Sequence, residues 1–330
     1  MKNILVIISL ILLWSSAPSE IKMQDKERYC IAEAIKISKQ YSNSIWKDFN
    51  KTPFTLLLVT KDYEFLINHP SPSKDFKFLK YDDLLESKIF YRDTQFNTSF
   101  LATFPAVNGV NCIVVGTPEN TNRNSTEWII TLLHEHFHKY VYDSKNYYDA
   151  VNDLDLANGD NTGMWMLNYP FPYEDKKVAL LYNAYITSLK NLTAIENLTS
   201  EIFKDSYKTY LNNRQKFKSS ISASDYRYFS FQLWQEGIAR YTEMKLLKAM
   251  TNYEPSLTIS GLADYIDFNV YAEQMLKKEM GKLQTFKLAE QKRVCFYSVG
   301  LAEGLVLDKL NPKWGANYLI NKFYLEKYQN

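Results

Sequence analysis

The chain has 330 residues, which is enough for one large domain or two smaller lobes. Hydrophobic residues make up 46% and charged residues 23%, the balance of a globular protein and not of a disordered or fibrous one. The formal net charge is only +2, and neither half carries a long basic or acidic run. Nucleic acid is therefore not expected as a partner.

The first residues have the pattern of a signal peptide. Lys2 is followed by an apolar run, Ile4 to Trp14, that is too short to span a bilayer. Ala17 and Ser19 are small residues at the −3 and −1 positions of a cleavage site. We therefore expect residues 1–19 to be removed and the mature protein to be secreted or periplasmic, with no membrane segment after cleavage. An uncleaved anchor is the alternative.

The first half of the chain predicts a small sheet with helices. A helix is expected over residues 24–48, where apolar residues recur along one face. Buried strands are expected over 54–60 and 111–116, which are apolar and rich in β-branched residues. A second helix is expected over 125–141. These elements form the predicted N-terminal lobe, residues 20–143.

The second half predicts a helical lobe, residues 144–330. It begins with a segment rich in Gly, Pro and aromatic residues, 143–173, and a loop of that length in a compact domain is often functional. The fold class is therefore α+β, with a small mixed sheet before a mostly helical lobe. Helices are expected over 174–190, 194–218, 224–249, 262–283, 287–309 and 315–328.

The three cysteines, Cys30, Cys112 and Cys295, are far apart in the sequence. They form no C-x-x-C pair, so neither a zinc ribbon nor a disulfide scaffold is expected. At most one disulfide can form among them. We expect all three to be small buried residues.

The helix at 125–141 carries the H-E-x-x-H motif. Positions i and i+4 of a helix differ by only about 40° around its axis, so His134 and His138 can bind one ion. Glu135 follows the first ligand and would act as general base for hydrolysis at a zinc site. His136 lies about 200° from His134, which predicts a packing role. Ser125 or Thr126 would cap this helix.

A second segment, W-Q-E-G-I-A-R-Y-T-E at 234–243, carries a resemblance to a known family. Together with H-E-x-x-H it resembles the gluzincin metallopeptidases, especially the branch similar to aminopeptidase N and leukotriene hydrolase. The resemblance implies a zincin-like catalytic unit in which Glu236 is the third ligand of one zinc ion. The alternative is a surface pair between Glu236 and Arg240. Gly237 in mid-helix indicates that another backbone approaches closely.

The same resemblance extends to a tyrosine. The family carries a Y-x-x-G segment whose tyrosine stabilises the oxyanion, and Tyr297 to Gly300 matches it in spelling and order. The family's exopeptidase motif G-x-M-E-N is not clearly present. The similar spelling around Glu119 lies closer to the zinc helix than the family places it, so a plain loop residue is expected there. Glu243 is a candidate for supporting a histidine ligand.

The expected function is hydrolysis of peptide or protein substrates by an exported zinc metallopeptidase. The strand at 111–116 is expected to offer its edge to an extended peptide, with the aromatic segment 165–173 beside it. Two alternatives remain open at this stage. One is a zinc amidase or deacylase acting on another amide. The other is an inactive exported binding protein that keeps the fold, although Glu135 would then have no purpose.

Overall fold

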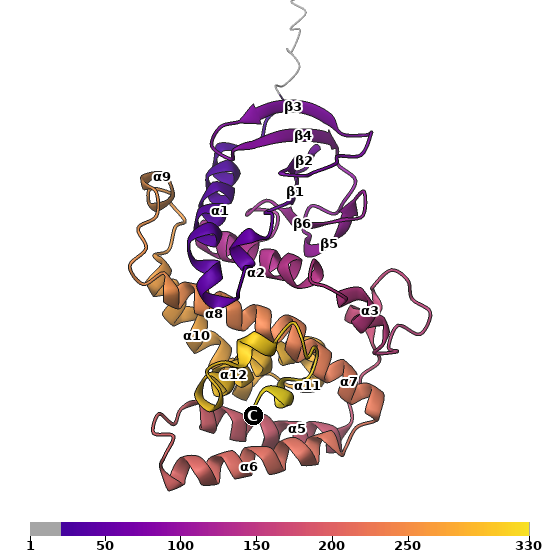
Figure 1. The fold of residues 1–330 in the computed structure, drawn as a ribbon, viewed down its shortest axis with the longest axis vertical. Helices are drawn as coiled ribbons and strands as arrows, with labels where there is room; N and C mark the ends of the chain where they lie inside the picture. The colour runs from indigo at the N-terminus through magenta and orange to yellow at the C-terminus, as the bar shows by residue number, and fades with distance from the viewer. Residues whose placement is uncertain (1–20, 330) are drawn as a thin grey trace, which may run out of the picture.

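The computed structural model describes residues 21–329, so the expected signal peptide at 1–19 lies outside the described residues. The chain is α+β, with one six-stranded mixed sheet and many helices. In Figure 1 the sheet forms one end of an elongated molecule and a helical lobe forms the other. Helix α2 (Ser125–Tyr142) runs between them. The strands are β1 (Leu56–Val59), β2 (Tyr63–Ile67), β3 (Lys77–Asp82), β4 (Ser87–Asp93), β5 (Leu101–Val107) and β6 (Val110–Gly116).

The strand order of the sheet is β3-β4-β2-β1-β6-β5. Strands β1 and β6 pair in parallel, and every other neighbouring pair is antiparallel. The sequence predicted only β1 and β6, which are fully or almost fully buried. The missed outer strand β3 is mostly exposed and carries charged residues, so its pattern does not stand out from that of a loop.

The two predicted strands are apolar on both faces because both faces of the sheet are covered. Leu56 and Leu58 of β1 face the main core beside the helices. Leu57 and Val59 face a second, smaller cluster that contains Phe76. The main core continues through the helical lobe as far as Tyr328, so the sheet and the lobe share one hydrophobic interior.

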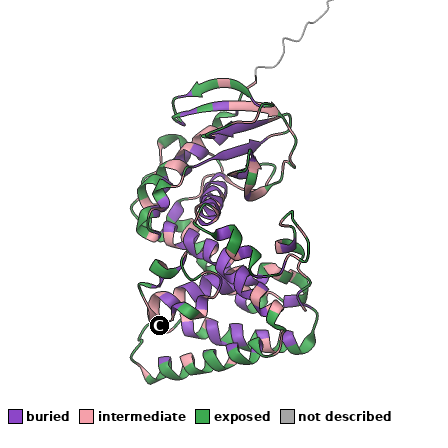
Figure 2. Cartoon of the chain, turned by 45° about the vertical axis from the view of Figure 1, so that its right-hand side comes forward, coloured by how far each residue is buried: buried purple, intermediate pink, exposed green. Residues whose placement is uncertain are grey.

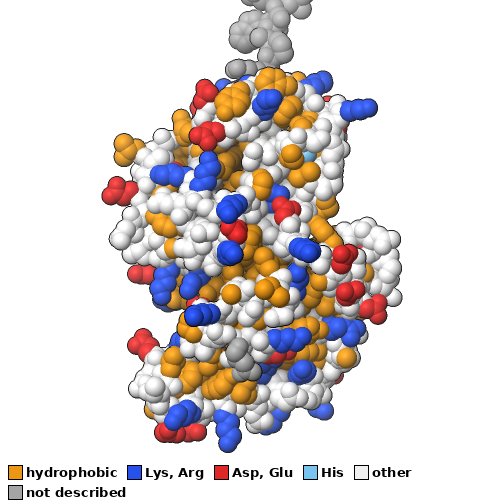
Figure 3. All heavy atoms as spheres, in the orientation of Figure 1, with side chains coloured by type: hydrophobic (Ala, Val, Ile, Leu, Met, Phe, Trp, Pro, Cys, Tyr) orange, Lys and Arg blue, Asp and Glu red, His pale blue; other side chains and the backbone are white. Residues whose placement is uncertain are grey.

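Helix α12 lies at the centre of the helical lobe, in contact with α5, α8 and α10. Figure 2 shows buried residues concentrated in α2 and in the inner helices, whereas much of the outer α6 is exposed. On the face drawn in Figure 3, acidic and basic side chains are interspersed. The other helices are α1 (Asp25–Ile45), α3 (Tyr147–Asn152), α4 (Trp165–Asn168), α5 (Lys176–Thr193), α6 (Glu201–Lys218), α7 (Ala223–Gln232), α8 (Ile238–Ala249), α9 (Leu257–Ser260), α10 (Phe268–Thr285), α11 (Leu288–Gln291) and α12 (Cys295–Leu310).

The predicted helix at 315–328 is wrong. Two 3₁₀ turns, Trp314–Asn317 and Leu325–Tyr328, stand there instead. Phe323 between them has a positive φ of 76°, which a helix does not allow. A tertiary contact with Trp234 determines the conformation of this segment. The indole N–H of Trp234 donates to both the Tyr318 carbonyl and the Tyr328 hydroxyl.

Three further findings concern the sequence predictions. All three cysteines are free and buried, as expected. His69 stands in a loop flanked by prolines, for which the sequence predicts a surface position, but it is buried: its ring bonds the Val107 carbonyl and the Ser71 amide. Within residues 21–329, no helix is long and apolar enough to cross a membrane.

Candidate metal centre

The motif helix α2 begins with a capping box. The Asn124 side chain accepts from the Glu127 backbone, and the Glu127 carboxylate accepts from the Asn124 backbone. The cap is therefore Asn124 and not Ser125 or Thr126, because Ser125 and Thr126 instead bond the Asp264 carboxylate and the Ile266 carbonyl. The box and the buried faces of α2 hold the helix rigidly between the sheet and the lobe.

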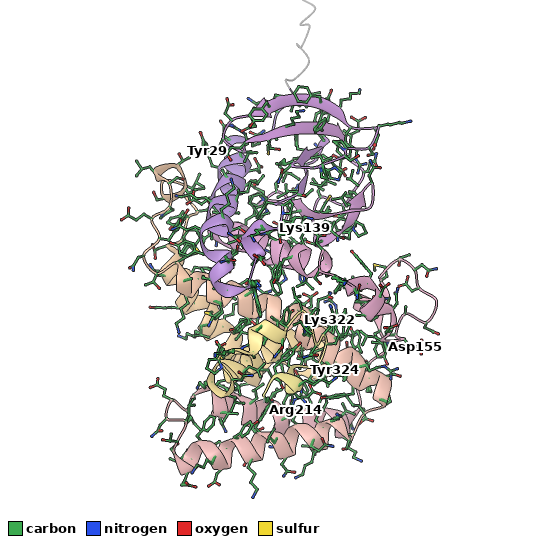
Figure 4. The ribbon with its side chains drawn as sticks, viewed as in Figure 1. Tyr29, Lys139, Asp155, Arg214, Lys322 and Tyr324 are labelled. Atoms are coloured by element: carbon green, nitrogen blue, oxygen red, sulfur yellow. The ribbon has the colours of Figure 1, made fainter. Side chains whose placement is uncertain are left out.

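His134 and His138 point to one place from successive turns of α2. Their Nε2 atoms are 3.0 Å apart, and both side chains are buried. Figure 4 marks Lys139, the residue after His138, where α2 passes between the sheet and the helical lobe. The two imidazoles thus meet at the junction of the two parts of the fold.

Glu236 reaches the same point from the helical lobe. Its Oε2 atom lies 3.5 Å from His138 Nε2 and 3.8 Å from His134 Nε2. These three residues are the group that could hold a metal ion among the described residues. The alternative of a surface pair between Glu236 and Arg240 is not what the structure shows, because Arg240 bonds Glu243 instead.

A π-helical segment, η2 (Leu233–Gly237), carries Glu236 within the otherwise continuous helix of α7 and α8. Its wide turn is closed by a bond from the Ile238 amide to the Leu233 carbonyl. Such segments are rare and occur frequently at functional sites. The sequence predicted one uninterrupted helix here and did not reveal the π turn, which changes the direction in which Glu236 points.

Glu243 holds the first histidine in place. Its Oε1 atom bonds His134 Nδ1, and its Oε2 atom accepts from Arg240 Nη1 at 2.9 Å. A proton on Nδ1 that points at a carboxylate leaves the Nε2 lone pair free for a metal. Burial alone would lower the pKa of His134, but the Glu243 and Glu236 carboxylates outweigh it and raise that pKa to about 9.

The residues present fit a zinc ion. Zinc held by bonds of about 2.0–2.1 Å keeps tetrahedral ligand atoms about 3.3 Å apart, close to the three separations between His134, His138 and Glu236. Two imidazole nitrogens and one carboxylate oxygen form a common catalytic zinc set, with one position left for water or substrate. His138 Nδ1 has no hydrogen-bond partner among the described residues, so hydrogen bonding at Nδ1 does not determine which nitrogen of the His138 ring carries the proton.

Glu135, the expected base, lies on α2 directly beside the first ligand and is almost fully buried. The hydroxyl of Thr103 lies 2.9 Å from both its Oε2 atom and its backbone carbonyl. Thr103 belongs to β5, the edge strand next to α2. This contact could not be predicted from the sequence because β5 itself was not predicted.

Tyr297 lies beside Glu236, and its hydroxyl is within electrostatic reach of the Glu236 carboxylate. Burial and that carboxylate together raise the pKa of Tyr297, while Arg293 opposes the rise. The crossing of two helices explains this position. A Cβ added to Gly300 would meet Gly237 Cα at 2.5 Å, so the two backbones touch where only glycine fits. Tyr297 stands one turn before that crossing.

His136 takes no part in the centre, as the helical spacing predicts. Its Nδ1 bonds the Ser38 hydroxyl and its Nε2 bonds the Thr52 carbonyl, both at 3.0 Å. The ring packs against Phe49 and Phe54. Burial lowers its pKa to about 3, so it stays neutral.

Tyr142 is a site residue that the sequence analysis missed. It lies one turn after His138, with ring centroids 5.7 Å apart, and its hydroxyl accepts from Gln235 Nε2 at 3.0 Å. Burial raises its pKa well above the ordinary value. The i+4 spacing from His138 was a usable signal, since it places Tyr142 on the ligand face of the helix.

Two other candidates lie elsewhere. Glu119 pairs with Lys26 at 2.7 Å and is largely exposed. The edge expected for the strand at 111–116 is also wrong, because β6 lies between β1 and β5 and leaves β5 at the rim.

The aromatic segment 165–173 packs onto the helical lobe. Trp165 lies against Phe231, and Phe171 lies against Phe296. Met166 is the member that approaches the centre, with its sulfur 3.9 Å from Gln235 Nε2. Most of the segment therefore contributes to the core.

Comparison of the chain with protein-family models, with curated proteins and with solved structures finds no match in any of the three. A function for this chain therefore has to be inferred from the geometry of this site.

Proposed function

We propose that the chain is an exported zinc metallopeptidase with a zincin-like catalytic unit. One zinc ion would be held by His134, His138 and Glu236. The observation that carries the proposal is the convergence of two imidazoles and one carboxylate beside Glu135. A structural zinc site has no need of a neighbouring base, and it more often uses cysteines.

A bound zinc ion would polarise a substrate carbonyl and lower the pKa of an attacking water toward about 7. Glu135 would accept the proton of that water and later deliver it to the leaving amine. Thr103 orients the Glu135 carboxylate through Oε2. Tyr297 would donate a hydrogen bond to the developing oxyanion, where a preorganised donor acts most strongly.

The edge strand β5 favours a peptide over other amides. Within the described sheet, one side of β5 pairs with β6 and the other side has no partner strand. An extended peptide can add to such an edge through its backbone hydrogen bonds. Thr103 connects β5 to Glu135, so a peptide on this edge would run past the base.

The test compares the mature protein with Glu135→Gln. Metal content is measured by elemental analysis, and hydrolysis is followed by mass spectrometry of a mixed peptide library. The wild type should contain one zinc per chain and cut peptides. Glu135→Gln should keep its zinc and lose about 10²–10⁴ in rate, since the amide cannot take a proton. The control Glu119→Gln changes a largely exposed carboxylate and should leave the rate unchanged.

The outcomes separate the alternatives. A protein that binds no zinc would contradict the metal centre. A zinc protein that hydrolyses small acyl amides but no peptide would be an amidase. Near-normal turnover of Glu135→Gln would remove Glu135 from the mechanism.

A further inference from the structure

Arg293 is a cation beside the candidate metal centre. Its Nη1 atom donates to the Tyr297 hydroxyl at 2.5 Å, and its Cζ lies 5.7 Å from the centroid of that ring. No Asp or Glu among residues 21–329 forms an ion pair with it. Its attraction to Glu236 acts at longer range. A guanidinium has five N–H donors, and this contact uses one of them.

Most of the other arginines in the described structure form ion pairs with acids, and the remaining two, Arg123 and Arg227, each bond two neighbouring oxygens. Arg214 bonds Glu303 and Glu326, and Arg240 bonds Glu243. Arg123, which pairs with no acid in the described structure, still bonds the Thr131 hydroxyl and the Thr121 carbonyl. Burying a guanidinium is costly unless its donors are satisfied. Arg293 is half-buried, and its free nitrogens are not sealed in the interior.

The contact with Tyr297 also sets the direction of the phenol. A guanidinium has donors but no acceptor, so the Tyr297 oxygen must accept from Arg293. The phenolic proton then points away from Arg293 and is free to bond another acceptor. The free guanidinium donors and the phenolic O–H thus lie next to each other at the metal site.

The backbone just before Arg293 is strained. Lys292 has φ 48° and ψ −133°, a conformation that non-glycine residues seldom adopt. It separates the short α11 from the turn that leads into α12. Strain of this kind persists when surrounding structure enforces it, and it clusters at binding sites. In this chain the strained residue, Lys292, comes directly before Arg293, which contacts Tyr297.

We propose that Arg293 binds a carboxylate of the substrate close to the scissile bond. Carboxylate is the group that a guanidinium binds best, through two parallel hydrogen bonds. The inference rests on the proposed peptidase function, since it places this carboxylate within reach of the reacting carbonyl. The carboxylate is either the C-terminus of a peptide or an acidic side chain.

The test measures binding of small thiols to the Co²⁺-substituted protein, whose thiolate absorption band reports direct contact with the metal. The probes are 3-mercaptopropanoate and 4-mercaptobutanoate, each compared with its uncharged amide. The wild type should bind at least one acid about 10- to 100-fold more tightly than the matching amide. Arg293→Met should abolish this preference without weakening the amide. Arg293→Lys should keep part of it.

The neighbouring cation supplies the control. Lys292→Gln removes an exposed charge next to Arg293 and should leave the preference for acids intact. Metal content and unfolding by urea are measured for each variant, so loss of the fold or the ion is seen directly. A preference for acids that survives in Arg293→Met overturns the inference, as does a wild type that binds acid and amide equally.

Metal uptake and the peptide digest complete the test. A protein that takes up no metal overturns the proposed function and this inference together. In the peptide digest, cuts near free C-termini that disappear on C-terminal amidation would identify the terminal carboxylate. Cuts beside Asp or Glu in amidated peptides would identify an acidic side chain. Cuts that depend on neither would count against a carboxylate anchor.

Discussion

The contact between Gly237 and Gly300 gives the most direct test of how the site is built. Gly300→Ala would place a methyl group 2.5 Å from Gly237 Cα and 2.6 Å from the Leu233 carbonyl oxygen. Ordinary contacts of this kind lie at 3.4–4 Å. The two helices would therefore have to separate by about 1 Å, because both obstacles are backbone atoms that cannot rotate away.

The magnitude follows from two opposing effects. Overpacking a close-packed interface costs about 1–3 kcal/mol, and a clash between backbones belongs at the upper end. Alanine in place of glycine in a helix contributes about 1 kcal/mol in the other direction. The free energy of unfolding should therefore fall by about 2 kcal/mol. A shift of about 1 Å would also move Tyr297 away from Glu236, and misplacement of that size can lower a rate about 100-fold.

Gly281 provides the matched control. It lies inside α10, and a Cβ added there would meet nothing within 4 Å. Gly281→Ala should therefore stabilise the protein by up to about 1 kcal/mol. Both variants are measured by urea unfolding with a shared m-value, alongside zinc content and peptide hydrolysis. If Gly300→Ala unfolds like Gly281→Ala and keeps full activity, the close crossing does not position the site.

Four further predictions follow from individual contacts. His136→Ala should keep its zinc yet lose about 3 kcal/mol of stability in urea unfolding, because it empties a buried aromatic pocket; loss of zinc would make it a ligand. Glu243→Gln should weaken zinc binding about 10- to 100-fold in a chelator competition, and unchanged affinity would deny it a role in orienting His134. Tyr297→Phe should keep zinc and thermal stability but lower kcat and kcat/KM together, by about 2.7–4 kcal/mol of transition-state stabilisation; a lower Tm with intact turnover would make it a core residue. The pKa of Glu326 lies below its ordinary 4.5, because the charge of Arg214 outweighs the effect of burial. The ionised Glu326 therefore stabilises the fold above pH 4.5, and this stabilisation is lost as the pH falls through the folded-state pKa. Glu326→Gln should therefore lose stability less steeply than wild type between pH 5 and 3 in urea titrations (an interval of about two units around the ordinary value), and parallel curves would contradict this.

Much of the motif helix could be predicted because its logic is local. The i, i+4 spacing of His134 and His138 sets their common direction by helix geometry alone, and the same geometry directs His136 elsewhere. Gly237 likewise indicated a close backbone approach before any partner was known, since mid-helix glycine is costly without a reason. The buried strand at 111–116 could be recognised because both of its faces are apolar.

The remaining features depend on segments that are remote in the sequence. Glu243 lies 109 residues after His134, and only the tertiary structure shows that it bonds the His134 ring. The same fold shows that Arg240 pairs with Glu243 and not with Glu236. Thr103 reaches Glu135 from a strand with no clear pattern, so its sequence held no signal for that contact.

The positions of Glu236, Tyr297 and Arg293 at the centre also could not be predicted without the tertiary structure. The π turn at 233–237 changes the direction of Glu236, and hydrophobic periodicity cannot reveal one such turn inside a long helix. The crossing of Gly237 and Gly300 then brings Tyr297 and Arg293 to the ligands. Local sequence thus determined which residues of α2 face the candidate site, because helix geometry acts over a few residues. The packing of distant helices decided what surrounds them, because close contacts between backbones depend on the whole fold.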